Sequence, residues 1–371
     1  EHCWPGELEG LVVTRYGHGL PTRQIEVLEA AHPVPDASGL AAAKRILELA
    51  RSAGPKDLVI CLLSGGASAL LTLPADGISL GDKQEVNEAL LRSGAPIEAM
   101  NLVRKRLSGI KGGRLGAAIA PAEALTLLIS DVPGDSPAVI GSGPTVVDTQ
   151  ATAQAALAVV EQFGLRLPAN VLGVLEHNAG PTGLPNNQRV ALIATAQKSL
   201  DEAAQFARSQ GVAPLILGDA IEGEARVVAQ AMAERVRQLQ GQPQDGGPPP
   251  ARPCVMLSGG ETSVTLAGGS GGDGGRGGRN SEFLLALAIA LDERPGVYAL
   301  ACDTDGIDGS EDNAGAVIGP ETLRRAGDLV VSPRDCLIAH DAYGFFAALG
   351  DLVVTGPTRT NVNDFRAVYL S

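Results

Sequence analysis

Along the first 240 residues, short apolar runs alternate with segments in which apolar residues recur at helical spacing. The centre of Asp57–Ser64 (DLVICLLS) is continuously apolar, as in a strand buried in a parallel sheet. Ser38–Ala53 has helical spacing and ends at Gly54-Pro55, a pair that stops helices. Alternating strands and helices predict an α/β fold with a doubly wound parallel sheet. Further strands are expected at Leu11–Thr14, Ala124–Asp131, Val190–Thr195 and Pro214–Gly218, and further helices at Ala151–Phe163, Leu200–Gln210 and Glu224–Gln240.

A proline- and glycine-rich segment, Gly241–Pro253 (GQPQDGGPPPARP), interrupts this alternation. Three consecutive prolines cannot lie in a helix or a central strand, so the segment is expected to be a surface linker. We therefore predict an N-terminal domain over 1–242, a linker over 243–253 and a C-terminal α/β domain over 254–371. In the last of these, strands are expected at Val255–Ser258, Val297–Cys302, Leu352–Thr355 and Ala367–Leu370, and helices at Ser281–Leu291 and after Ser332.

Charge and cysteine content narrow the class of protein. The formal net charge of −13 argues against nucleic acid or an anionic membrane surface as a partner. The longest apolar run, Phe283–Leu291, is too short to span a bilayer. The five cysteines form no CxxC pair, and Cys61, Cys254 and Cys302 are expected as small buried residues of a cytoplasmic protein.

Two glycine turns in the first half suggest anion binding. Ser64, Gly65, Gly66 and Ser68 follow a predicted strand, where ligands gather in open α/β sheets. Their backbone amides and hydroxyls suit a phosphate, although a tight strand-to-helix turn explains the motif equally well. The second turn contains Lys111, Gly112 and Gly113 and follows Arg104, Lys105 and Arg106. Lys105 and Lys111 could reach one phosphate, and the alternative is a solvated basic helix face.

Acidic residues follow two other strands. Asp131 and Asp135 leave the strand at Ala124, a common position for Mg²⁺ ligands, and a further glycine turn with hydroxyls follows at 141–145. The alternative is ordinary Asx turns. Asp303, Asp305 and Asp308 follow the strand at Val297, but the pattern lacks the closing Glu of a calcium loop, so a Mg²⁺ or substrate site fits better. A polar segment at 360–364 suggests a pocket nearby.

The strand-then-SGG pattern recurs in the second half. Gly259, Gly260, Glu261 and Thr262 precede an eleven-residue stretch at 268–278 that contains eight glycines, and Arg279 and Asn280 then open a helix. A glycine-rich loop that leads into a helix N-terminus suits a nucleotide phosphate, with Arg279 placed to bind phosphoryl oxygens. The alternative is a glycine loop with Asn280 or Ser281 only capping the helix. There is no GxxxxGK[ST] motif, and a GxGxxG match at Gly269, Gly271 and Gly274 is nearly forced by composition.

Taken together, these segments resemble the class II glycerate kinases. The resemblance runs colinearly through VTRYGHG, HPVPDASG, LLSGGASALL, NLVRKRLSGIKGGRL, LISDVPGD with GSGPTV, LSGGETSV, GGRNSEF, ACDTDGIDG and TGPTRTNVNDF. It implies a Rossmann-like N-terminal domain and a smaller MOFRL domain, with the active site in the cleft between them. It also implies transfer of the γ-phosphate of ATP to D-glycerate with Mg²⁺, typically giving 2-phosphoglycerate, and a homodimer is possible.

The resemblance also implies roles for the residues singled out above. Arg279 is the strongest catalytic candidate, because it could stabilise charge on the transferring phosphoryl group. The other catalytic candidates are Lys105, Lys111 and Asp135. The metal candidates are Asp131, Asp303, Asp305 and Asp308, and the nucleotide-binding candidates are Ser64, Gly65, Gly66, Ser68, Gly112, Gly113, Gly259, Gly260, Glu261, Thr262 and Asn280.

One feature of the family is not matched. Its members carry a Gly-Lys-Ala type motif before the VTRYGHG segment, and the chain begins at Glu1 without it. We expect a missing upstream segment, and weak or no activity from these 371 residues alone. Two alternatives stay open: a hydroxypyruvate reductase, for which the usual acidic ribose contact is not where it should be, and a non-catalytic binding protein on the same scaffold.

Overall fold

The computed structural model describes residues 1, 3–181, 187–241, 252–266 and 275–371, and the chain divides into two compact units, Glu1–Ile193 and Ala194–Ser371. The expected linker at 243–253 lies almost entirely outside the described residues. The structure divides the chain earlier because a strand before that segment, β6 (Ala213–Gly218), pairs in parallel with β8 (Cys254–Gly260) after it. The residues from 194 to 240 therefore belong to the second unit.

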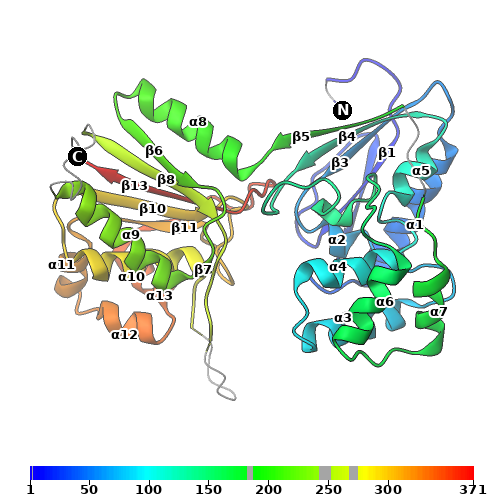
Figure 1. Ribbon diagram of the computed structural model, residues 1–371. Helices are drawn as coiled ribbons and strands as arrows, with labels where there is room; N and C mark the ends of the chain where they lie inside the picture. The colour runs from blue at the N-terminus through cyan, green and yellow to red at the C-terminus, as the bar shows by residue number, and fades with distance from the viewer. Residues whose placement is uncertain (2, 182–186, 242–251, 267–274) are drawn as a thin grey trace. The chain divides into compact units, whose positions relative to one another are not determined.

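Two small sheets and a group of helices make up the first unit (Figure 1). β1 (Gly10–Arg15) pairs in parallel with β2 (Ile25–Ala30), a strand that the sequence analysis did not predict. A three-stranded sheet has the order β3-β4-β5, with β3 parallel to β4. Its strands are β3 (Leu58–Leu63), β4 (Glu123–Ile129) and β5 (Gln188–Ala194); the helices are α1 (Ala37–Ser52), α2 (Ala67–Leu70), α3 (Leu80–Arg92), α4 (Ile97–Arg106), α5 (Arg114–Ile119), the 3₁₀ turn η1 (Ile140–Ser142), α6 (Ala153–Gln162) and α7 (Ala169–His177).

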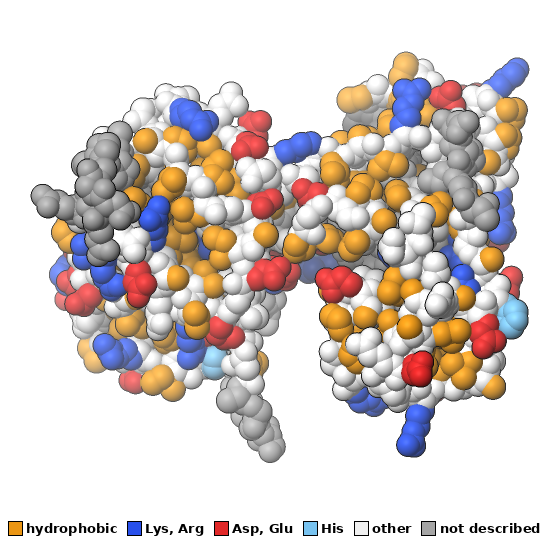
Figure 2. Space-filling view, viewed as in Figure 1, with side chains coloured by type: hydrophobic (Ala, Val, Ile, Leu, Met, Phe, Trp, Pro, Cys, Tyr) orange, Lys and Arg blue, Asp and Glu red, His pale blue; other side chains and the backbone are white. Residues whose placement is uncertain are grey.

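Strand β3 is covered on one face only within this unit. Val59 and Cys61 pack with α1 and α5 in one core cluster. The alternate residues Leu58, Ile60 and Leu62 are 43%, 40% and 69% exposed, and Figure 2 shows apolar side chains over this sheet. The expectation of a strand buried on both faces was therefore wrong for the first unit by itself. A second core cluster joins α3, α4, α6 and α7, which lie together in Figure 1.

The second unit is built on a six-stranded mixed sheet of order β12-β11-β10-β13-β8-β6. β6 and β8 are parallel, whereas β13 is antiparallel to both of its neighbours, β8 and β10. The remaining strands are β7 (Gly223–Glu224), β9 (Thr262–Ser263), β10 (Val297–Asp303), β11 (Gly315–Ile318), β12 (Leu352–Val353) and β13 (Asp364–Leu370); the helices are α8 (Ala196–Ser209), α9 (Ala225–Gln240), α10 (Arg279–Leu291), α11 (Thr322–Asp328), α12 (Pro333–Ile338) and α13 (Ala342–Leu349).

Alternation of side chains along β8 explains how this sheet is covered. Val255 and Leu257 pack with α8 on one face. Cys254 and Met256 face the larger core formed with α9, α10 and α13, as the arrangement in Figure 1 shows. The two-residue period of a strand thus supplies both faces of a three-layered α/β unit. In the described part of the chain, no helix has the length and hydropathy needed to cross a membrane.

A substitution at Gly315 in β11 tests how closely β10 and β11 must approach each other. A Cβ on this glycine would lie 1.9 Å from the carbonyl oxygen of Ala301 and 2.7 Å from the Cα of Cys302. We expect Gly315→Ala to lower the free energy of unfolding of the second unit by about 2–3 kcal/mol, because the strands must separate to admit the methyl group. Urea unfolding measures this. The control is Gly327→Ala in α11, where a Cβ has no neighbour within 4 Å and stability should hold or rise slightly.

Candidate active site

The N-terminus of α10 is capped from a distant loop. The carboxylate of Asp308 accepts from the backbone amides of Asn280 (2.9 Å) and Ser281 (2.8 Å), and also from the side chains of both residues. Asp308 is fully buried, and burial raises its pKa, although these hydrogen bonds act to lower it. The carboxylate therefore occupies the place at the helix N-terminus where the sequence predicted a phosphate. Both of its oxygens accept hydrogen bonds from the first turn of α10, so the Asp308 carboxylate has a structural role at this helix N-terminus.

Sheet pairing brings three chemically important segments together. In the register of the sheet, Asp364 at the start of β13 lies opposite Asp303 at the end of β10 and opposite Gly260 at the end of β8. Because β13 is antiparallel to both neighbours, its first residue lies at their carboxyl ends. The edge of the sheet thus collects residues separated by about a hundred positions in the chain.

Arg279, the first residue of α10, lies over this edge. Its guanidinium group donates from Nε to Asp364 (2.8 Å), from Nη2 to Asp303 (2.7 Å) and from Nη1 to Glu261 (2.9 Å). Burial acts to lower the pKa of Arg279, but the three carboxylates outweigh it and raise the pKa above its ordinary value. The structure places Arg279 and Glu261 in one cluster and adds Asp364, which the sequence marked only as part of a polar segment.

Asp303 is the carboxyl group most altered by this environment. Burial raises its pKa to about 7, an effect that Arg279 opposes and that the nearby Asp305 and Asp364 reinforce. The Asp305 amide donates to the Asp303 carboxylate at 3.1 Å. A carboxyl group whose pKa is raised in this way by burial and neighbouring carboxylates is common at functional sites.

Arg366 is a second arginine of this cluster that sequence reasoning missed. It is fully buried, donates to Asp364 at 2.5 Å and to the Gly259 carbonyl at 3.2 Å, and its guanidinium carbon lies 5.4 Å from the ring centre of Phe283. In sequence it alternates with apolar residues of β13, so only its position on an otherwise apolar strand could have drawn attention to it.

The SGGET turn is shaped partly by backbone packing. Gly260 has φ of +109°, and a Cβ there would lie 2.2 Å from the amide nitrogen of Ile221. Thr262 donates its backbone amide to Asp364 at 3.3 Å, so the turn adjoins the Arg279 cluster. The glycines Gly269, Gly271 and Gly274 of the GxGxxG match lie outside the described residues.

In the first unit, the three glycine turns that the sequence showed separately form one structure. Lys111 donates from Nζ to the carbonyl (2.5 Å) and hydroxyl (3.0 Å) of Ser68, and the Ser68 and Ser142 hydroxyls are 2.8 Å apart. The amides of Gly112 and Gly113 donate to the carbonyls of Ser142 (3.2 Å) and Gly143 (2.8 Å). Gly113 must be a glycine, because φ is +86° and a Cβ would lie 2.8 Å from Val147. Lys111 is buried at this junction, so the alternative of a solvated basic helix face does not hold for it.

Other basic side chains surround Lys111. Lys105 is buried and pairs with Asp148 at 2.5 Å. Burial lowers the pKa of Lys111 well below its ordinary value, and Lys83, Arg104 and Lys105 lower it further. Lys83, on α3, and Arg104 were not among the predicted site residues. Lys83 escaped notice because it is one polar residue on an amphipathic helix, with no motif around it.

The other predicted site residues of the first unit lie near the ends of β3 and β4. Gly66 has φ of +79°, and a Cβ there would lie 3.2 Å from Nε2 of His32, whose pKa is lowered by burial and by Arg15. Asp131 follows β4, and Asp135 lies in the next turn with φ of +53°. Asp131 and Asp135 belong to the first unit, whereas Asp303, Asp305 and Asp308 belong to the second.

The pair Asp303 and Asp305 is chemically suited to Mg²⁺. This ion usually takes one or two carboxylates and completes its shell with water and substrate phosphates. Within the described residues, no three His, Cys, Asp or Glu side chains converge on one metal position, so a cage made of protein ligands alone does not fit. Two adjacent carboxylates in a cluster with excess negative charge do fit.

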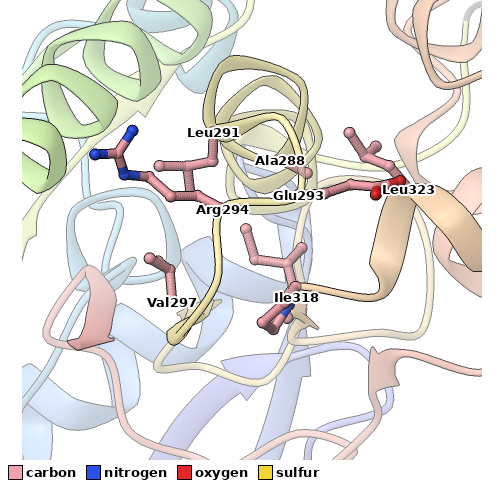
Figure 3. A pocket seen from close by; sticks show the side chains of 9 residues that line it. Ala288, Leu291, Glu293, Arg294, Val297, Ile318 and Leu323 are labelled. Carbon is pink, nitrogen blue, oxygen red and sulfur yellow. The ribbon is translucent and has the colours of Figure 1, made fainter. Parts of the chain in front are cut away.

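A small pocket at the other end of α10 does not belong to this site. It is lined by Leu291, Arg294, Val297, Ile318 and Leu323, among others, as Figure 3 shows. Leu291 is the last residue of α10 and Arg279 is the first, so the thirteen-residue helix separates them by about 18 Å.

Comparison with known proteins identifies the family. Residues 1–176 match a domain family of unknown function, DUF4147, and residues 254–364 match the MOFRL family. An Agrobacterium vitis protein, provisionally named a hydroxypyruvate reductase, is 50% identical over 99% of this chain and 83% of its own. The D-glycerate 2-kinase of Thermotoga maritima is 38% identical over 96% of this chain and 83% of its own.

Solved structures agree with this assignment. The crystal structure of glycerate kinase from Thermotoga maritima matches with a TM-score of 0.88 at 38% identity, covering 98% of this chain and 85% of that one. The likeness extends through both units, and the resemblance noted in the sequence is confirmed. The chain belongs to the DUF4147–MOFRL family of glycerate kinases.

Proposed function

We propose that this protein is a D-glycerate 2-kinase, which transfers the γ-phosphate of ATP to D-glycerate and yields 2-phosphoglycerate. The family relationship supports the phosphotransferase class and ATP as the phosphoryl donor. The single structural observation that carries the proposal is the guanidinium group of Arg279, which three carboxylates hold at the edge of the sheet. A planar donor fixed in this way is suited to binding phosphoryl oxygens.

In this proposal the residues of the second unit have distinct tasks. Arg279 stabilises charge on the transferring phosphoryl group, and Asp364 and Asp308 hold Arg279 and the start of α10 in place. Asp303 and Asp305 hold Mg²⁺, which would neutralise phosphate charge when bound. In the first unit, Lys111, Ser68 and the turns around them bind the substrates. We place the enzyme in the cytoplasm, acting on small molecules and without nucleic acid or membrane partners; a homodimer remains part of the proposal.

A hydroxypyruvate reductase is the second candidate, because two relatives from Agrobacterium vitis, both 50% identical, carry that provisional name. The kinase is favoured because relatives named glycerate 2-kinase occur in both Thermotoga maritima and Pyrococcus horikoshii, at 38% and 35% identity. We expect the complete gene product to release ADP with D-glycerate and to leave NADH unoxidised with hydroxypyruvate. NADH oxidation without ATP consumption would establish the reductase instead.

The role of Arg279 is tested in the same gene product, with enolase as coupling enzyme so that only 2-phosphoglycerate gives a signal. We expect Arg279→Ala to lower kcat by about 10³-fold or more, as loss of a phosphoryl-binding arginine does in other phosphotransferases. Arg279→Lys should recover only part of the rate, because an ammonium group keeps the charge but lacks the planar array of donors that fits these three carboxylates and a phosphoryl group.

The matched control is Arg276→Ala. Arg276 lies three residues earlier, is exposed and pairs with Glu311, so its loss should change kcat less than about twofold. Circular dichroism and thermal unfolding show whether each variant is folded. A folded Arg279→Ala enzyme with the wild-type rate would refute the catalytic role. Release of ADP without an enolase signal would show that the product is not 2-phosphoglycerate.

A further inference from the structure

We propose that Lys83, Arg104 and Lys111 form an oxyanion-binding site in the first unit, which takes the phosphate or carboxylate group of a small-molecule substrate. The identity of that substrate rests on the proposed function, whereas the site itself does not. Three features support this site: cationic atoms buried without an acceptor among the described residues, the local balance of charge, and the rigid turns beside them.

Two cationic nitrogens in this region are buried without a partner in the described part of the chain. Among the described residues, Nζ of Lys83 and Nε of Arg104 are inaccessible to solvent and have no hydrogen-bond acceptor. Buried polar atoms are nearly always paired, and an unpaired cation is the most unfavourable exception. An ordered anion would supply the missing acceptor for both.

The surrounding residues keep these cations close together. Arg104 on α4 donates through Nη2 to Asn87. Asn87 is one helical turn beyond Lys83 on α3, so the two side chains occupy the same helix face. Lys83 in turn acts electrostatically on Lys111, which is fixed to Ser68. The cluster is therefore anchored to both the α3–α4 pair and the glycine turn after β3.

Acidic side chains do not balance this charge. Among the neighbouring cations in the described part of the chain, Lys105 forms an ion pair, with Asp148. Asp82, next to Lys83, instead caps its own helix through Ser79 and contacts Asn170. Lys83, Arg104 and Lys111 thus leave an excess of positive charge inside a chain whose formal net charge is −13.

The chemistry of these groups selects an oxyanion. Two ammonium groups and a guanidinium group offer only hydrogen-bond donors, and the hydroxyls of Ser68 and Ser142 lie beside Lys111. A compact group with several acceptor oxygens fits such a cluster. Two substrates of the proposed reaction carry one: the nucleotide has phosphates, and glycerate has a carboxylate.

The test compares Lys83→Met with Lys44→Met in titrations of inorganic phosphate by calorimetry. Methionine keeps the length of the side chain and removes the charge, and Lys44 is an exposed lysine of α1. We expect Lys83→Met to raise the Kd for phosphate about tenfold or more, and Lys44→Met to leave it unchanged. Equal phosphate binding by Lys83→Met and wild type, or no binding by wild type, would overturn the proposal.

Steady-state kinetics then distinguish the two sources of the oxyanion. A rise in KM confined to D-glycerate in Lys83→Met identifies the carboxylate, and a rise confined to ATP identifies a nucleotide phosphate. An enzyme without kinase activity that still binds phosphate through Lys83 would refute the proposed function and leave this site intact. Loss of kcat with both KM values unchanged would refute a binding role for Lys83.

The stability of the same variants provides an independent check. Burial, together with Arg104, lowers the pKa of Lys83 to about 8. Between pH 8 and the ordinary value of 10.5, the unfolded chain binds more protons at this group, so Lys83 makes wild-type stability rise with pH. Without phosphate, Lys83→Met should be more stable than wild type below pH 8, and the advantage should shrink towards pH 10.5. Saturating phosphate should reverse the order, and a variant that is less stable at every pH without phosphate would contradict the prediction.

Discussion

The carboxylate of Asp364 is the interaction on which the site of the second unit depends. Its two oxygens accept from Arg279, Asn280, Arg366 and the backbone amide of Thr262. It therefore joins the start of α10, the short strand β9 and the interior of β13 through one group. Removing it would leave Arg366 buried without its charge partner, which in comparable buried pairs costs about 3–5 kcal/mol. Asp364 is thus needed for the fold of this edge as well as for the position of Arg279.

The two units contain buried clusters of opposite net charge. Around Arg279, several carboxylates meet two arginines, and the surplus is negative. Around Lys111, the surplus is positive, and Nζ of Lys83 has no acceptor among the residues that the structure describes. A protein that only had to fold would be more stable with apolar groups at such positions. Unbalanced buried charge of either sign is expected where a charged substrate or a metal ion binds. Both clusters are therefore more informative about function than the small pocket at the end of α10.

Much of the fold could be predicted from the sequence, because periodicity and helix caps are local signals. A helix was expected after Ser332, for example, and Ser332 caps α12 by accepting from the amide of Asp335. The strands at Leu58, Ala213 and Val297 were likewise visible as apolar runs. The boundary between the two units could not be read from the sequence. Composition draws attention to the proline-rich segment, whereas the parallel pairing of β6 with β8 depends on residues about forty positions apart. The roles of Asp364, Arg366 and Lys83 could not be predicted for the same reason, because each of them interacts with residues that are distant in the chain.

Asp308 has a structural role that its sequence motif does not reveal. Its position after β10 and before glycine suggested a metal ligand, and the glycine-rich entry to α10 suggested a phosphate at the helix N-terminus. The structure joins the two features, because the carboxylate itself satisfies the amides of Asn280 and Ser281. Because the amides at this end of α10 are already engaged, we propose that the side chain of Arg279 recognises the phosphoryl group here. A phosphate bound directly at this helix N-terminus would have to compete with the Asp308 carboxylate for the same backbone amides.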